Sequence, residues 1–271
     1  MKNNMAVLFV VLGIVVLFAS SSFADPFYIW DDWGGTWADA EKTIGNVDDD
    51  KLCWAAASSN ILEYTGWGLV GGMTTTDDIF AHFGTHFTDK GGNPYYGYDW
   101  WWDGTNEAQG VAGWAQEDVD GGGGFYSTLN IDDYRRWTST DSTALSALDT
   151  WMHDGFGTTI SISGNMSHAI TAWGFEYDTD NPNYYTGIYV TDSDDDKYNS
   201  PTYPDSLRYY DLSYTGSRWY LSGGYYGTGT TNYISEVSGL QLKINPVPSA
   251  VILGSIGITF SGWLLRRRKE F

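Results

Sequence analysis

The pattern of apolar and polar positions predicts helices in the first half of the chain. Acidic residues at 48–50 precede an alanine-rich run over Lys51–Tyr64, and Gly66 follows that run. Acidic residues before a helix and a glycine after it are the usual start and stop signals, so a helix is expected there. Further helices are expected over Thr75–His82 and Thr143–His153.

The pattern changes to an alternation with a period of two residues from Thr158 onward. Such alternation is typical of strands, and the Asp-Asn-Pro-Asn run at 180–183 marks a turn between two of them. The expected strands are Thr158–Ser163, His168–Phe175, Gly187–Asp192, Arg208–Ser213, Ser217–Ser222 and Tyr233–Lys243. Helices followed by an antiparallel sheet predict an α+β fold.

The other segments are rich in aromatic residues and predict little regular structure. Asp25–Asn46 is expected to be irregular, and Gly66–Trp137 is rich in glycine and tryptophan, with Thr75–His82 as its predicted helix. Trp100–Trp102 could line a groove for a peptide or a glycan. Aromatic clusters in a tryptophan-rich protein lie more often in the core, so we expect these side chains to be buried.

Residues 1–24 have the features of a secretory signal peptide. Lys2 precedes an uncharged apolar run over Ala6–Ala19, and small residues end the segment at Ala24. The alternative is an N-terminal membrane anchor, but the run is shorter than the ~20 residues that a span needs. We therefore expect export, with cleavage by signal peptidase after Ala24.

Residues 246–271 form a second terminal signal. A short proline motif leads into an uncharged apolar stretch, Val251–Leu265, and the basic cluster Arg266–Lys269 follows. The apolar region is long enough to cross a bilayer, with the basic cluster on the cytoplasmic side. A plain tail anchor has similar features, but the order of the three parts resembles the PEP-CTERM sorting signal of Gram-negative bacteria, with Val247 where that signal usually has Glu. The resemblance implies transient tethering to the inner membrane, removal of the tail near Pro248 by an exosortase-type enzyme, and then attachment to the cell surface or matrix, or secretion.

Composition limits the classes of protein to which the segment 25–245 can belong. The chain of 271 residues has 34 acidic and 14 basic residues, a net charge of −20. Binding to a nucleic-acid backbone needs a basic surface, so this charge argues against nucleic acid as a partner. The single cysteine, Cys53, excludes a disulfide within the chain and a cysteine-rich metal site. The segment is long enough for one domain with its own core.

Cys53 stands at the start of the first predicted helix, where a thiolate is favoured. Unpaired backbone N–H groups and the helix dipole stabilise negative charge at that end, and the thiolate is the nucleophilic form of cysteine. The alternative is a small, inert core residue. A nucleophile also needs a proton carrier for the leaving group, and histidine is the usual one because its pKa lies near neutrality. The candidates are His82, His86, His153 and His168.

The hairpin geometry selects His168 among the four histidines. If the turn centres near Asn181 and Pro182, His168 lies opposite Asp194, with Asp192 as its diagonal neighbour. Cβ atoms of opposite residues in an antiparallel pair lie ~5 Å apart, and diagonal ones ~7–8 Å. An acid at either position would fix the tautomer of the imidazole and stabilise its charged form. The register leaves the choice between the two aspartates open.

Two groups of segments resemble the IdeS/Mac family of immunoglobulin-degrading cysteine peptidases. The first group is Lys42–Asn46 and Asp49–Cys53, which lead into the alanine-rich helix. The second is His168–Gly174 and Ile188–Asp194, which match the family's His, Trp-Gly and Tyr-Val-Thr-Asp-Ser-Asp elements at comparable spacing. The middle of this chain is shorter than in the immunoglobulin-cleaving members, so the resemblance implies their chemistry but not their substrate.

The resemblance implies a papain-like fold and a role for each of five residues. Cys53 would be the nucleophile, and His168 would be the general base and acid. Asp192 would orient His168, and Asp194 would be a supporting acid. Lys42 would stabilise the oxyanion, in the place that a glutamine fills in papain itself. No cofactor is implied.

The expected function is therefore that of an exported papain-like cysteine endopeptidase, which hydrolyses protein or peptide substrates through a covalent thioester. Two alternatives stay open. A cysteine acyltransferase would use the same site, and a non-enzymatic surface protein would bind extracellular polysaccharide through Trp and Tyr side chains. Rapid labelling of Cys53 by a thiol alkylator at neutral pH would separate the enzymes from the binding protein.

The acidic run Asp192–Asp196 also begins like an EF-hand calcium loop. Lys197 stands where such a loop needs glycine, and Tyr203 stands where it needs the bidentate glutamate, so an EF-hand is excluded. A calcium site of another kind stays open on the sequence.

Overall fold

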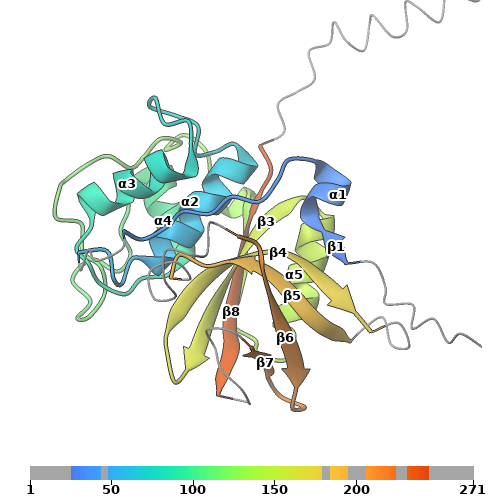
Figure 1. Cartoon of the computed structure of the whole chain (residues 1–271). Coiled ribbons are helices and arrows are strands. Elements are labelled where there is room, and N and C mark those ends of the chain that lie inside the picture. The colour runs from blue at the N-terminus through green and yellow to red at the C-terminus, as the bar shows by residue number, and fades with distance from the viewer. Residues whose placement is uncertain (1–25, 44–47, 179–183, 195–205, 224–230, 244–271) are drawn as a thin grey trace, which may run out of the picture.

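The computed structural model describes residues 26–43, 48–178, 184–194, 206–223 and 231–243, which form a helical part packed against a β-barrel (Figure 1). The predicted signal peptide, the predicted sorting tail, the predicted turn at 180–183 and residues 195–205 lie outside these ranges. Within the described ranges, no helix combines the length and the apolar character needed to cross a membrane.

The strands form one antiparallel sheet that closes into a barrel. Neighbouring strands follow the order β4–β3–β8–β7–β6–β5, and β4 also pairs with β5, which completes the ring. The short strands β1 and β2 pair with β4 and β8. The bounds are β1 Phe27–Tyr28, β2 Arg135–Thr138, β3 Phe156–Gly164, β4 His168–Tyr177, β5 Tyr185–Thr191, β6 Arg208–Tyr214, β7 Trp219–Ser222 and β8 Asn232–Gln241. The predicted α+β class is confirmed, whereas the closure of the sheet does not follow from the alternation of residues.

Helices α2, α3 and α4 lie together on one side of the barrel, and α5 packs against strands β3 and β8 elsewhere (Figure 1). The bounds are α1 Ile29–Trp33, α2 Cys53–Thr65, α3 Thr76–His86, α4 Pro94–Asp103, the 3-10 helix η1 Ile131–Asp133 and α5 Ala144–His153. The three predicted helices correspond to α2, α3 and α5, and α3 continues one turn further than predicted, to His86.

Two regions have more regular structure than the sequence pattern predicts. The segment expected to be irregular contains β1 and α1, and the Gly/Trp-rich region contains α4 and β2. Local signals start α4, because the Asn93 side chain accepts from the N–H of Tyr95 and Pro94 occupies the first turn. The rest of α4 is aromatic with modest helix propensity, so burial stabilises it. Trp100–Trp102 are fully buried, which confirms that they belong to the core.

Helix α2 packs between the other helices and the barrel, against β3 and β4. Two glycines permit this close approach. A Cβ added at Gly157 on β3 would lie 3.0 Å from Ile61, and one added at Gly92 would lie 2.6 Å from the ring of Trp54. A side chain at either position would push its segment away from α2. These two glycines therefore let α2 pack closely on β3 on one side and on the segment before α4 on the other.

Candidate active site

Cys53 and His168 are the first residues of α2 and β4, and their side chains meet where these two elements converge. The thiol of Cys53 forms a hydrogen bond with the imidazole of His168. His168 is only 7% exposed, whereas Cys53 is partly exposed. The packing of α2 on β4 thus leaves Cys53 partly exposed and buries His168.

Asp192 holds the imidazole from its other nitrogen. The Nε2–H of His168 donates to Oδ1 of Asp192 at 2.6 Å, and Asp192 is fully buried. The backbone N–H of Asp194 donates to the same oxygen at 3.0 Å and fixes the carboxylate. Because Nε2 is engaged, Nδ1 is the ring nitrogen left for the thiol of Cys53. The carboxylate therefore sets the tautomer of His168 and stabilises its protonated form.

The pairing of β4 with β5 explains why two acids reach the same histidine. Thr171 pairs with Thr191, which is the register predicted from a turn centred near Asn181 and Pro182. β5 ends at Thr191, so the chain turns at residues 192–194 instead of continuing opposite His168. This turn brings Asp192 to Nε2 and leaves Oδ2 of Asp194 3.7 Å from Nδ1. The direct hydrogen bond is therefore made by Asp192.

Lys42 reaches the same centre from the segment that precedes α2. Its Nζ donates to Oδ1 of Asp194 at 2.5 Å and to the carbonyl oxygen of Asp50 at 2.9 Å. Its backbone N–H donates to the carbonyl oxygen of Ser193 at 3.3 Å. Lys42 is 2% exposed, so it is not a solvated surface lysine. The structure thus brings together all five residues that the sequence singles out.

The electrostatics of the cluster favour a charged pair of Cys53 and His168. Burial by itself raises the pKa of the Cys53 thiol, but the charges of His168 and Lys42 outweigh that effect and hold the pKa below its ordinary value. Burial by itself lowers the pKa of His168, but Asp192 and the Cys53 thiolate hold it well above its ordinary value. Both shifts favour thiolate and imidazolium over the neutral pair.

The start of α2 also supplies backbone donors beside the sulfur. The residue before the helix, Leu52, makes no side-chain capping hydrogen bond. The first N–H groups of a helix have no acceptor within the helix, so that of Cys53 can donate to an anion bound at this end. The ammonium of Lys42 lies close enough to stabilise a negative charge on Cys53. A developing oxyanion at this point would have two kinds of positive partner.

An open cleft of about 540 Å³ runs past Cys53. This volume lies within the range of ordinary ligand sites. The helical side of the cleft and the barrel side both contribute to its lining, which comprises Asp50, Lys51, Cys53, Gly91, Gly92, Asn93, Gly113, Trp114, Ser161, Ile162, Ser163, Met166, Ser167, His168, Ala169, Asp194 and Glu236. The nucleophile candidate therefore faces a space that admits a polypeptide segment.

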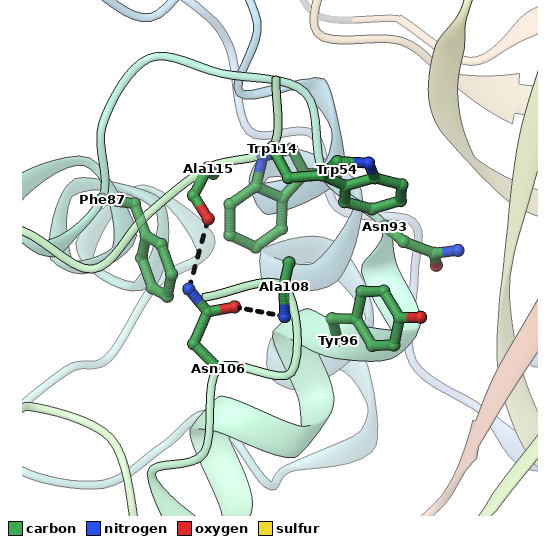
Figure 2. Close-up of a pocket in the computed structure, with 9 residues that line it drawn as sticks. Trp54, Phe87, Asn93, Tyr96, Asn106, Ala108, Trp114 and Ala115 are labelled. Carbon is green, nitrogen blue, oxygen red and sulfur yellow. Dashed lines mark hydrogen bonds between the residues drawn. The ribbon is translucent and has the colours of Figure 1, made fainter. Parts of the chain in front are cut away.

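A second hollow is shown in Figure 2. It has Gly92, Asn93 and Trp114 in common with the lining of the cleft. Its free volume is only about 10 Å³, which is about the space of one water molecule. Asn106 closes it, because its side chain accepts from the N–H of Ala108 at 3.0 Å and donates to the carbonyl of Ala115 at 3.2 Å. This hollow is too small for a substrate side chain, so we assign substrate binding to the larger cleft.

Asn60 on α2 is a residue of the site that the sequence pattern does not reveal. Its Oδ1 accepts from the backbone N–H of Ala40 at 2.8 Å and from the hydroxyl of Thr76 at 2.9 Å. Its Nδ2 donates to the hydroxyls of Thr171 and Thr191 at 2.9 and 3.3 Å. This buried amide ties α2 to β4, to β5 and to the segment that carries Lys42. An asparagine within an alanine-rich run is a weak signal of such a role.

The other histidines lie away from the cleft. Nε2 of His82 lies 2.8 Å from the carbonyl oxygen of Gly122, and Nδ1 of His153 lies 2.8 Å from Asp32. Across the described residues, no group of three or more His, Cys, Asp and Glu side chains is arranged to hold a metal ion. His168 is thus the histidine that the fold brings to the thiol.

Comparison with known proteins assigns no family. The chain matches no protein-family model and no curated protein. A function is therefore proposed from the geometry of the site and from the motifs that form it.

Proposed function

We propose that this protein is a papain-like cysteine endopeptidase that hydrolyses peptide bonds through a thioester at Cys53. The main support is the chain of contacts from Cys53 through His168 to Asp192, with the sulfur at an open cleft. A nucleophile, a base in contact with it and an acid that orients the base are the parts of a covalent hydrolase. A thiol at a helix start facing a histidine on a barrel strand is also the arrangement of a papain-like fold.

The acylation step follows from the position of each group. The thiolate of Cys53 attacks the carbonyl carbon of the scissile peptide bond, and the carbonyl oxygen becomes an oxyanion. The N–H of Cys53 and the ammonium of Lys42 stabilise that oxyanion. The imidazolium of His168 gives its proton to the leaving nitrogen, and the C–N bond breaks. The amine product departs, and the acyl group stays on sulfur as a thioester.

Deacylation reverses the role of His168. The imidazole, now neutral, takes a proton from a water molecule, and the resulting hydroxide attacks the thioester carbon. A second oxyanion forms in the same place and collapses with cleavage of the C–S bond. The acid product leaves, and the thiolate–imidazolium pair is restored. Asp192 orients His168 and stabilises its charge in both steps.

The two alternatives receive less support. A cysteine acyltransferase would form the same acyl-enzyme and pass the acyl group to an amine, but an open cleft gives water access to the thioester. A polysaccharide-binding protein would need a surface cluster of aromatic rings. The Trp100–Trp102 cluster is fully buried, and the large aromatic side chains that are exposed among the described residues, Trp33, Trp137 and Tyr209, lie on three different elements, α1, β2 and β6. Hydrolysis is therefore the function that we assign.

We also propose that the enzyme acts outside the cytoplasm. The support comes from the terminal segments 1–24 and 246–271, with signal peptidase and an exosortase-type enzyme as processing partners. The protein would be tethered to the inner membrane for a time and would then reach the cell surface, the matrix or the medium. Its protein or peptide substrates would be found there.

The test is a cleavage profile on a mixture of proteome-derived peptides, with Cys53→Ala as the control. New peptide ends produced only by the wild-type protein would support the endopeptidase. Rapid alkylation of Cys53 without peptide hydrolysis, but with acyl transfer to added amines, would favour the acyltransferase. Slow alkylation together with no cleavage would overturn the enzyme assignment.

A further inference from the structure

The barrel side of the cleft contains one row of side chains that runs across three strands. Glu236 on β8 pairs with Ser161 on β3, and Ser161 pairs with Ala169 on β4. Residues paired in an antiparallel sheet point to the same face, so these three side chains form a row. The row begins beside the nucleophile, because the backbone N–H of Ala169 forms a hydrogen bond with Cys53. It ends at the carboxylate of Glu236.

This row faces the helices and not the barrel interior. The neighbouring row contains Thr171, whose hydroxyl accepts from Asn60 of α2. Side chains two residues apart on a strand share a face, so Ala169 and its row face the same way. The side chains of Ala169 and Ser161 are small, so they leave space in the cleft between Cys53 and Glu236. All three residues line the cleft.

Neutral groups hold Glu236 in place. The side-chain amide of Asn93, at the start of α4, donates to Oε1, and the indole N–H of Trp137 also donates to the carboxylate. Within the described parts of the chain, no Lys, Arg or His side chain is paired with it. Its partial burial raises its pKa, because the carboxylate has lost part of its hydration. Among the residues that the structure describes, this partly desolvated carboxylate therefore has no cationic partner.

The distance from the nucleophile to Glu236 corresponds to a short stretch of substrate. Neighbouring strands lie ~4.8 Å apart, so Glu236 is about 10 Å from Ala169 across two strand spacings. An extended peptide advances ~3.3–3.6 Å per residue. A substrate side chain two or three residues from the scissile bond would therefore reach the carboxylate.

We propose that Glu236 determines specificity by binding the Lys or Arg side chain of a substrate residue two or three positions from the scissile bond. This inference rests on the proposed peptidase function. Trp137, which donates its indole N–H to Glu236, is 47% exposed, so an aromatic side chain that could also contact the cation lies beside the carboxylate. The acidic chain, with a net charge of −20, attracts basic peptides to the cleft.

The test measures kcat/KM on internally quenched peptides of one parent sequence, in which Lys, norleucine or Glu is placed in turn at each position near the scissile bond. The wild-type enzyme is expected to prefer Lys over norleucine by about 10- to 100-fold at one position, since a charge-assisted hydrogen bond is stronger than a neutral contact. Glu236→Gln is expected to remove this preference. Glu236→Lys is expected to favour Glu at the same position, and this reversal does not depend on the overall activity of the variant.

Glu176→Gln is the matched control. Glu176 is also a partly exposed glutamate of the sheet and also accepts from two neutral donors, the hydroxyls of Tyr189 and Tyr209 at 2.7 and 2.9 Å. It lies near the opposite end of β4 from His168, eight residues or roughly 26 Å away. This variant is expected to keep the preference for Lys.

Three outcomes decide the inference. Loss of the Lys preference in Glu236→Gln with its retention in Glu176→Gln supports it. Cleavage without a Lys preference, or with a preference that Glu236→Gln leaves unchanged, overturns it while the peptidase function stands. Cleavage of no peptide, together with slow alkylation of Cys53, overturns the peptidase function and this inference with it.

Discussion

Lys42 and Asp194 form a buried ion pair, in which Nζ and Oδ1 lie 2.5 Å apart although 152 positions separate the two residues in the sequence. The other oxygen of Asp194 lies 3.7 Å from Nδ1 of His168. The pair is therefore part of the same charged cluster as Cys53. Removal of one partner leaves the other as an uncompensated buried charge, which is strongly destabilising. A substitution of Lys42 alone is therefore expected to lower stability as well as turnover.

We expect Lys42→Met to lower turnover by ~100- to 1000-fold, because the oxyanion loses a charged donor. The double variant Lys42→Met, Asp194→Asn removes the orphaned charge and should recover stability but not turnover. Steady-state kinetics and thermal unfolding of both proteins check this, with Lys90→Met, an exposed lysine, as the control. Turnover within a few-fold of the wild type in the double variant would mean that the oxyanion donor lies elsewhere.

Cys53→Ala is expected to lower peptide hydrolysis by at least ~1000-fold, because the variant lacks the thiol that forms the acyl-enzyme. The fold should persist, since Cys53 is only partly buried and alanine continues the alanine-rich run of α2. Circular dichroism and thermal unfolding establish the fold, and a peptide assay establishes the loss. Hydrolysis near the wild-type rate would refute the proposed nucleophile.

The alkylation rate of Cys53 is expected to report its lowered pKa. The thiolate is the reactive form, so the rate of reaction with iodoacetamide should rise with pH through a midpoint below 9.0, the ordinary value. His168→Gln removes the adjacent positive charge and should move that midpoint upward. Hydrolysis should also fall at alkaline pH, when His168 loses its proton. An unchanged midpoint in His168→Gln would show that the two groups are not coupled.

Asn60→Ala is expected to lower the free energy of unfolding by about 2–4 kcal/mol, because it leaves several buried hydrogen-bonding groups without a partner. The segment that carries Lys42 loses the hydrogen bond at Ala40, so turnover should fall as well. Urea denaturation measures the stability. Asn130→Ala is the control, because Asn130 is exposed and caps only η1, and it should cost about 1 kcal/mol or less. An equal loss in the free energy of unfolding for the two variants would show that the hydrogen bonds of Asn60 contribute no more to stability than an exposed cap.

The mature protein is expected to end near Pro248, without Val251–Lys269. The order of proline motif, apolar stretch and basic cluster is the reason, since it resembles an exosortase substrate. Intact-mass analysis of the native protein measures the C-terminus. A mass that includes Arg266–Lys269, found only in detergent-solubilised membranes, would instead establish a permanent anchor and leave the peptidase proposal untouched.

Features whose causes lie within a few residues of one another can be predicted from the sequence alone. The acidic residues and the alanine-rich run predict α2, and the structure begins that helix at Cys53. The predicted turn at 180–183 implies the register in which Thr171 pairs with Thr191, and the structure has this pairing. That register leads Asp192 and Asp194 toward His168, and the chain turn after β5 decides that Asp192 makes the direct hydrogen bond. Helix signals and hairpin registers are local, so they can be read along the chain.

Features that depend on contacts between distant segments can be recognised only in the folded protein. Helix α4 has local start signals at Asn93 and Pro94, but its aromatic residues are held in a helix by their burial in the core. The closure of the barrel and the hydrogen bonds of Asn60 have no local signal that predicts them. The same holds for Glu236, because an alternating strand does not show which of its polar residues faces a cleft and which faces solvent. That difference depends on the helices packed against the sheet, and their burial of apolar surface is a property of the whole fold.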